Sequence, residues 1–187
     1  MILASKRTIR NLLRKHDIHP SKKLGQNFLI DKIALKKIVI AAKLSSEDTI
    51  LEIGPGLGTL TIELAKKAKK VISVEKDKKI CEVLADILSN RNIQNIQIIN
   101  QDVLDSKFQI LDSKYKIVSN LPYYITSPVI RKFLEVKNPP KEMILMVQKE
   151  VAQRICAKPP KMSILAVSVQ FYSLPKIISY ISKKSFW

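Results

Sequence analysis

The sequence predicts an α/β fold, with a mostly parallel sheet and helices on both faces. Four short apolar runs lack the polar alternation of a half-exposed strand: residues 49–54, 71–75, 96–100 and 116–121. Such near-continuous runs are typical of strands that are buried on both sides. Longer amphipathic stretches at 59–70 and 78–90 separate three of these strands and indicate helices. Strands that alternate with helices at this spacing pair in parallel.

The flanking segments extend this pattern. Residues 6–16 predict a short basic helix, and Asp31 stands directly before an apolar-periodic stretch that predicts a second helix through Ala42. Four further elements follow the fourth strand: a strand at 142–147, a helix at 148–157 and two β-like stretches at 163–172 and 176–182.

Length and composition limit the classes of protein that need to be considered. A chain of 187 residues with 46% apolar and 26% charged residues predicts one globular domain with room for a small appendage. Cys81 and Cys156 have no metal-ligand spacing, so we expect neither a disulfide scaffold nor a metal site. No apolar run reaches the roughly 18 residues of a membrane helix. We therefore expect a cytoplasmic protein, with an organellar presequence in the acid-free first 16 residues as the alternative.

The net charge of +17 is concentrated at the two ends of the chain. Residues 1–43 carry +9 and residues 131–187 carry +8, whereas residues 44–130 are neutral. This distribution favours a polyanionic partner held by the periphery of a neutral core, with nucleic acid as the first candidate. Lysine accounts for most of the excess, so a general compositional bias is the alternative explanation.

Three of the four glycines lie in the sequence LEIGPGLGTL: Gly54, Gly56 and Gly58. They follow the first predicted strand and precede a helix, where glycine allows a tight turn and lets a ligand approach backbone N–H groups. A P-loop would require Gly-Lys-Ser/Thr, and a dinucleotide fingerprint would require glycine at position 59, where Thr59 stands. The observed GxGxG, preceded by Glu52, resembles the S-adenosylmethionine loop of Rossmann-like methyltransferases. A purely structural turn is the alternative.

Carboxylates follow the next two predicted strands. Glu75 stands 21 residues after Gly54, where an acidic residue of a nucleotide-binding fold accepts the ribose hydroxyls. Asp102, after the third strand, is similarly placed to reach the exocyclic amine of a cofactor adenine. A solvated ion pair with Lys76, Lys78 or Lys79 is the alternative role of Glu75.

The sequence SNLPYYITSP at 119–128 follows the fourth apolar strand. In a doubly wound sheet, the first and fourth strands flank the crevice where ligands bind, so Asn120 is expected beside the glycine loop. The Asn120 side-chain oxygen and a backbone carbonyl at Leu121 or Pro122 can accept both hydrogens of an adenine amine. Pro122 stiffens the turn, and Tyr123 can stack on the base. An ordinary Asn-x-Pro turn with two core tyrosines is the alternative.

Together these residues resemble a known family. The matching segments are KKLGQNFLID (22–31), LEIGPGLGTLT (51–61), VEKD (74–77), QDVL (101–104), NLPYYITSPVI (120–130) and MVQKEVAQRI (146–155). In order and spacing they are similar to the ribosomal RNA adenine-N6,N6-dimethyltransferases, in particular the group that modifies small-subunit rRNA. The resemblance implies a Rossmann-like class I methyltransferase fold that dimethylates adjacent adenosines in ribosome biogenesis. It also implies S-adenosylmethionine as cofactor and S-adenosylhomocysteine as product.

The resemblance also assigns site residues. Gln26, Asn27 and Leu29 would cap the methionine end of the cofactor, although an ordinary loop before a helix, with Phe28 in the core, is the alternative. The remaining expected cofactor residues are Gly54, Gly56, Gly58, Glu75, Lys76, Asp102, Val103 and Asn120. The expected catalytic residues are Asn120, Leu121, Pro122, Tyr123 and Phe186, with Phe186 matching a family phenylalanine that stacks on the target base.

We interpret residues 1–187 as one catalytic domain, with an N-terminal basic and cofactor-capping part at 1–48 and the Rossmann-like core at 49–187. The family continues past this point with a small helical domain that the given sequence lacks. We expect a monomer that binds ribosomal RNA or a small-subunit precursor, without a metal or a membrane. Two alternatives remain: a large-subunit rRNA methyltransferase, and an RNA-binding assembly or transcription factor that retains the cofactor pocket.

Overall fold

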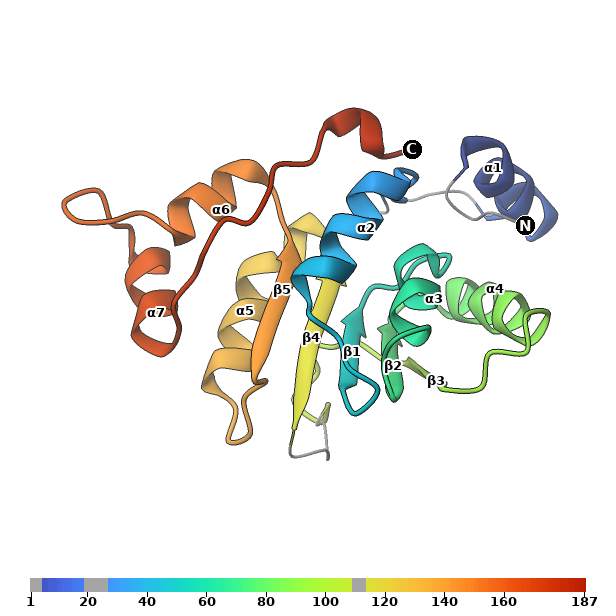
Figure 1. Ribbon diagram of the computed structural model, residues 1–187, viewed down its shortest axis with the longest axis horizontal. Coiled ribbons are helices and arrows are strands. Elements are labelled where there is room, and N and C mark those ends of the chain that lie inside the picture. The colour runs from blue at the N-terminus through green and yellow to red at the C-terminus, as the bar shows by residue number, and fades with distance from the viewer. Residues whose placement is uncertain (1–4, 19–26, 109–113) are drawn as a thin grey trace.

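A computed structural model describes residues 5–18, 27–108 and 114–187, and it contains a five-stranded sheet (Figure 1). The strands are β1 (Thr49–Ile53), β2 (Lys70–Glu75), β3 (Ile96–Asn100), β4 (Tyr115–Asn120) and β5 (Glu142–Met146). All neighbouring pairs are parallel, in the order β3-β2-β1-β4-β5. The strand order therefore reverses between β1 and β4, as a doubly wound sheet requires.

Helices cover both faces of this sheet, which confirms the predicted fold class (Figure 1). On one face lie α2 (Lys32–Ala41), α3 (Thr59–Ala65) and α4 (Lys78–Ser89), and on the other lies α5 (Thr126–Glu135). The remaining helices are α1 (Lys6–Lys15), α6 (Lys149–Ile155), α7 (Ile164–Tyr172) and the short 3-10 turns η2 (Tyr123–Ile125) and η3 (Lys183–Ser185).

The central strand β1 shows why its sequence is apolar at successive positions. Ile50 packs on the face that carries α2 and α3, whereas Leu51 and Ile53 pack on the opposite face with Phe133 of α5. All four of these side chains are at most 2% exposed. Burial on both sides removes the polar alternation, as the sequence predicts.

The N-terminal helices begin where the sequence predicts them. The Asp31 carboxylate accepts hydrogen bonds from Ile33 N at 2.7 Å and Ala34 N at 3.3 Å, and so caps α2. In α1, Ile9 and Leu13 are buried on one side, and the basic side chains project from the other. Among the described residues, no helix is long and apolar enough to span a membrane.

The prediction of β structure at 163–172 is wrong, because residues 164–172 form α7. Ser163 caps this helix by accepting a hydrogen bond from Ala166 N at 3.3 Å. The buried residues Ala166 and Val169 lie three positions apart, on one face of the helix. A continuous apolar run has neither the period of a strand nor that of a helix, so the sequence could not separate the two.

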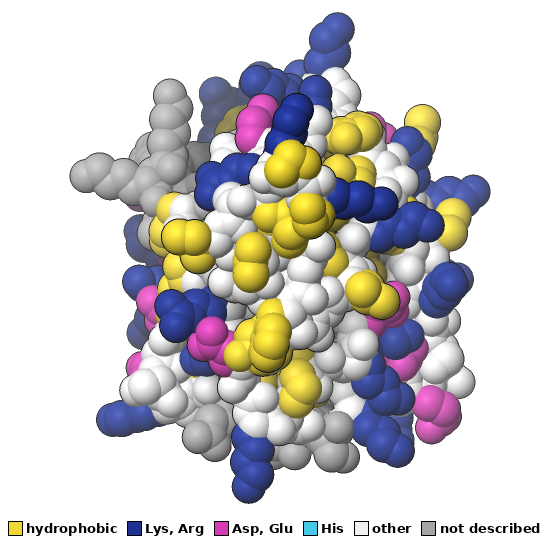
Figure 2. All heavy atoms as spheres, turned by 90° about the vertical axis from the view of Figure 1, so that its left-hand side faces the viewer, with side chains coloured by type: hydrophobic (Ala, Val, Ile, Leu, Met, Phe, Trp, Pro, Cys, Tyr) yellow, Lys and Arg dark blue, Asp and Glu magenta, His cyan; other side chains and the backbone are white. Residues whose placement is uncertain are grey.

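The prediction of β structure at 176–182 is also wrong, because these residues have no regular secondary structure. Large apolar side chains of α7 and of the segment after it are exposed: Ile164, Val167, Phe171, Tyr172, Leu174, Ile178 and Tyr180. Apolar side chains gather on the side of the molecule where α7 lies (Figure 2). The apolar pattern of this region thus reflects an exposed surface rather than a strand within the sheet.

Candidate active site

The glycine loop and the turn after β4 share one cavity. Both follow neighbouring parallel strands, since β1 pairs with β4 in the middle of the sheet. A Cβ built on Gly54 would lie 3.2 Å from the ring carbons of Pro122, so the two loops are in close contact. The predicted juxtaposition of Asn120 with the GxGxG loop is therefore what the structure shows.

Twelve of the predicted residues line this cavity at the carboxyl ends of the strands: Asn27, Leu29, Gly54, Gly56, Glu75, Lys76, Asp102, Val103, Asn120, Leu121, Pro122 and Tyr123. Gly58 and Phe186 are not among the lining residues. Gln26 lies outside the described residues. Phe28 is 6% exposed, as a core residue would be, yet its ring also lines the cavity.

Gly56 and Gly58 of the loop exclude a side chain for different structural reasons. A Cβ on Gly56 would lie 3.3 Å from the Phe28 ring, so a side chain here would crowd the cavity wall. Gly58 has φ +82°, and a Cβ there would approach Leu84 Cδ1 to 2.5 Å. Gly58 therefore permits the sharp entry into α3 and its packing on α4, without contributing to the cavity lining.

The ends of β2 and β3 form an acidic wall. Glu75 Oε1 accepts from Asp77 N at 3.0 Å, while burial raises the pKa of its carboxyl. The Asp102 carboxylate accepts from Lys76 Nζ at 2.9 Å and from Leu104 N at 2.9 Å, and these bonds lower its pKa. Lys76 thus pairs with Asp102 and not with Glu75, which leaves Glu75 facing the cavity.

Asn120 is oriented by the segment that precedes α2. Its Nδ2 donates to the Asn27 carbonyl at 3.2 Å, so its Oδ1 is the acceptor that the side chain can offer to a ligand. The Pro122 carbonyl accepts from Ile125 N at 3.2 Å and from Thr126 Oγ1 at 3.4 Å. Because those two bonds occupy both lone pairs, Leu121 carries the better candidate of the two predicted carbonyls.

Two adjacent tyrosines stand at the rim. Tyr123 and Tyr124 both line the cavity, Tyr123 is half-buried, and Tyr124 is 51% exposed. The alternative of two core tyrosines is therefore excluded. Aromatic faces at this edge can stack on a planar base that enters the cavity.

Residues 19–187 match the family described as ribosomal RNA adenine dimethylase. The chain belongs to this family. It is 44% identical to the ribosomal RNA small subunit methyltransferase A of Dehalococcoides mccartyi over 181 residues, and 40% identical to that of Clostridioides difficile over 185 residues. Each match covers 95% of the chain but only 62% and 63% of those relatives, so the chain spans less than two thirds of their length.

Solved structures agree with this assignment. A dimethyladenosine transferase from Plasmodium falciparum superposes with a TM-score of 0.67 and 33% identity, over 76% of this chain and 52% of that one. The 23S rRNA methyltransferase ErmE superposes with a TM-score of 0.60 and 33% identity, over 68% and 50%. The Rossmann-like class I methyltransferase fold is therefore shown.

The sequence pattern did not indicate the role of Glu52 in the cavity. Glu52 lines the cavity from within β1, is 1% exposed and accepts a hydrogen bond from Ser73 Oγ at 3.1 Å. Burial raises the pKa of its carboxyl to about 7, and the hydrogen bond from Ser73 only partly offsets the effect. A lone carboxylate inside an apolar strand was the signal that could have identified it.

Lys132, a second residue that the sequence pattern did not indicate, supports the cavity from outside. Its Nζ donates to the Val103 carbonyl at 2.8 Å and the Asp105 carbonyl at 2.6 Å, which fixes the loop after β3. The ammonium group also lies 5.4 Å from the centre of the Phe108 ring. No sequence motif predicts this contact, because it joins α5 to a loop that lies 27 to 29 residues earlier in the chain.

Phe186 takes part in the cavity wall only indirectly. The segment 185–187 runs antiparallel to 28–30, with Ile30 N donating to Ser185 O at 2.9 Å and Trp187 N to Phe28 O at 3.0 Å. The Phe186 side chain packs against the apolar core beneath α2. Its stacking on a target base remains a prediction. Within the described ranges, no cluster of His, Cys, Asp or Glu could hold a metal ion.

Proposed function

We propose that this chain transfers methyl groups from S-adenosylmethionine to N6 of adenines in small-subunit ribosomal RNA, twice per base, in the cytoplasm. The observation that carries the proposal is the cavity in which Asn120 lies on one side of the glycine loop, and the carboxylates that follow β2 and β3 lie on the other side. The small-subunit methyltransferase name of the relatives supports the choice of substrate.

The residues present fit this cofactor. Glu75 offers a carboxylate for the two ribose hydroxyls, and Asp102 offers an ionised acceptor for the adenine amine. Phe28 and Val103 supply apolar wall for the adenine faces, and Gly56 leaves the loop backbone open to the ligand. When bound, the cofactor supplies an electrophilic methyl group on a sulfonium and leaves as S-adenosylhomocysteine.

The residues of the chain orient the attacking amine. Asn120 Oδ1 and the Leu121 carbonyl accept its two N–H groups, which favours a pyramidal nitrogen whose lone pair points away from both acceptors. Tyr123 stacks on the base, so the base must be unstacked from its neighbours before it enters. No strong general base is needed, because the neutral amine attacks and its proton then leaves to water. Catalysis rests on orientation and hydrogen bonding.

Substitution of Asn120 tests the proposal. We expect Asn120→Ala to lower methyl transfer to unmodified small-subunit particles roughly a hundredfold or more, because one of the two amine acceptors is lost. Binding of S-adenosylhomocysteine, measured by calorimetry, should persist. Asn90→Ala is the matched control, since Asn90 is exposed at the end of α4, outside the cavity lining, and its Nδ2 donates to Asp86 O at 2.7 Å.

The outcomes separate the candidate functions. Unchanged turnover in Asn120→Ala would remove this role of Asn120. Wild-type protein that binds the particles without incorporating label would instead favour an RNA-binding factor that retains the pocket. Incorporation into large-subunit particles alone would favour the activity named for ErmE, which is 33% identical to this chain.

A further inference from the structure

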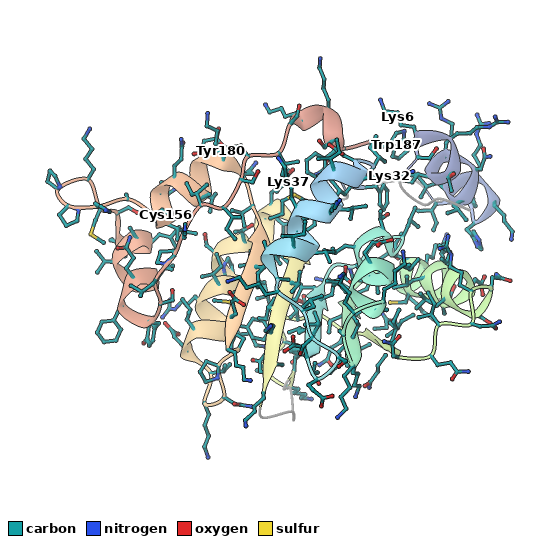
Figure 3. All side chains as sticks on the ribbon, viewed as in Figure 1. Lys6, Lys32, Lys37, Cys156, Tyr180 and Trp187 are labelled. Atoms are coloured by element: carbon teal, nitrogen blue, oxygen red, sulfur yellow. The ribbon has the colours of Figure 1, made fainter. Side chains whose placement is uncertain are left out.

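A continuous set of contacts crosses the molecule above α2, from α1 to α6 (Figure 3). Trp187 packs with Phe28 and with Ile9 and Leu13 of α1. Ser185 Oγ donates to Asp31 Oδ2 at 2.7 Å, which joins the terminal segment to α2. Lys37 Nζ donates to Ser179 Oγ at 3.3 Å, and Lys149 Nζ lies 5.8 Å from the centre of the Tyr180 ring.

Exposed lysines follow this path, which we call the basic ridge: Lys6, Lys32, Lys37, Lys149, Lys183 and Lys184. Within residues 5–18, 27–108 and 114–187, none of the six forms an ion pair with a carboxylate. Figure 3 shows Lys6, Trp187, Lys32, Lys37 and Tyr180 along the upper side of the molecule. Lys37 acts on Asp31 at longer range, where its charge contributes to a lowered pKa of that carboxyl. Exposed cations without a salt-bridge partner are the electrostatic feature that a phosphate backbone recognises.

A recess lies on the basic ridge, between α2 and the segment 180–185. Its lining combines an aromatic ring, aliphatic side chains, a lysine and hydroxyl groups, from Tyr180, Ile33, Lys37, Ser182 and Ser185. Tyr180 and Ile33 are 57% and 70% exposed, which is unusual for apolar side chains that line a recess. Asp31 is the one carboxylate in the lining, and it already accepts from Ile33 N, Ala34 N and Ser185 Oγ.

The recess and the cavity share a wall. Leu29 lines the cavity, and Asp31, two residues later, lines the recess. The bridge between Leu29 and Phe186 and the bond from Ile30 N to Ser185 O hold this wall in place. The lining of the recess therefore begins two residues beyond the lining of the cavity.

We propose that the recess binds one nucleotide of single-stranded RNA that flanks the target adenosine, with the base on Tyr180 and Ile33 and the phosphates on Lys37, Lys183 and Lys184. This inference rests on the proposed function, which places an unstacked adenine in the cavity. A planar base suits an aromatic and aliphatic floor, and the adjacent lysines suit the phosphates on either side.

The aromatic floor is tested with two substitutions at one position. We expect Tyr180→Ala to weaken binding of a single-stranded oligoribonucleotide with unpaired adenosines roughly tenfold, because stacking on the ring is lost. Tyr180→Phe keeps the ring and should bind as the wild type does. Fluorescence of Trp187, the only tryptophan of the chain, offers a readout on the basic ridge itself. Equal affinity of Tyr180→Ala and wild type would overturn the proposal.

The lysines are tested against a control of equal charge. The triple variant Lys37→Gln, Lys183→Gln, Lys184→Gln should make the slope of log affinity against log salt less negative by about 2, at roughly 0.7 per phosphate contact. The control removes three exposed lysines at the amino ends of β2 and β5: Lys67→Gln, Lys69→Gln and Lys141→Gln. Equal slopes in the two variants would show an effect of net charge alone and would overturn the proposal.

The inference and the proposed function fail in different ways. Cofactor binding by calorimetry should be unchanged in Tyr180→Ala and in both triple variants, since none of these residues lines the cavity. RNA binding that depends on Tyr180, in a wild-type protein that transfers no methyl group, would overturn the proposed activity but support the recess. Normal methyl transfer to particles, together with RNA binding that does not change in Tyr180→Ala, would support the proposed activity and overturn the recess.

Discussion

Apolar side chains are buried around the cavity, but many are exposed in the C-terminal segment, residues 149–187. Leu121, beside Asn120, is 1% exposed, whereas Leu174, after α7, is 98% exposed. Around the cavity, parallel strands are covered on both faces, so each side chain has a fixed neighbour. In residues 149–187, helices and an irregular segment pack on one side only. Rigidity at the cavity therefore comes from the sheet, and the C-terminal segment contributes surface.

The largest expected dependence of stability on pH concerns the buried carboxyl of Glu52. Its pKa rises from 4.5 to about 7 on folding, so the folded state holds a proton that the unfolded chain releases between those values. The free energy of unfolding should therefore fall as pH rises from 4.5 to 7, by up to about 3 kcal/mol, and then level off. Glu52→Gln should remove this part of the dependence, as measured by denaturant unfolding across the pH range.

A surface substitution provides the control for Glu52. Glu63→Gln, on α3, removes a carboxyl whose side chain is 40% exposed beside Lys66. It should change the free energy of unfolding by less than about 0.5 kcal/mol. If the pH curves of Glu52→Gln and wild type ran parallel, the buried carboxyl would not be the origin of the dependence, and the region around the cavity would be less tightly closed than described.

The difference between the two regions also explains which features could be predicted. The order of the apolar runs and the glycine loop determines which strand ends lie side by side. The shared location of Gly54, Glu75, Asp102 and Asn120 in one cavity could therefore be predicted from the sequence. The run ILAVSVQFY in α7 has no period, so its helix depends on a Ser163 cap and on burial of Val169, which only packing decides.

Two kinds of contact in the cavity wall also could not be predicted from the sequence: ion pairs of long side chains, and hydrogen bonds within a turn. Lys76 forms its ion pair with Asp102 and not with Glu75, because of the side-chain rotamers at the ends of two strands. The use of the Pro122 carbonyl by Ile125 N depends on the η2 turn, so the sequence could not tell it from the carbonyl of Leu121.

A smaller effect is expected at the rim of the cavity, where the side chains are partly exposed. Lys76→Met should weaken binding of S-adenosylhomocysteine two- to fivefold, about 1 kcal/mol or less, because the Asp102 carboxylate loses the partner that orients it. Lys79→Met, on the exposed side of α4, is the matched control and should leave the affinity unchanged. A loss beyond about tenfold would exceed what an exposed ion pair contributes and would indicate direct contact between Lys76 and the ligand.

The smallest effect should come from the apolar surface of the C-terminal segment. Phe171 is 81% exposed on α7, and its described ring partner is Tyr172, 5.0 Å away in an edge-to-face contact. Phe171→Ala should change the free energy of unfolding by less than about 0.5 kcal/mol, whereas Phe133→Ala in α5, where the ring is 2% exposed, should cost about 3–5 kcal/mol. Urea titrations of both variants measure the two values. Comparable losses would mean that α7 is buried in solution, and the contrast between the two regions would then disappear.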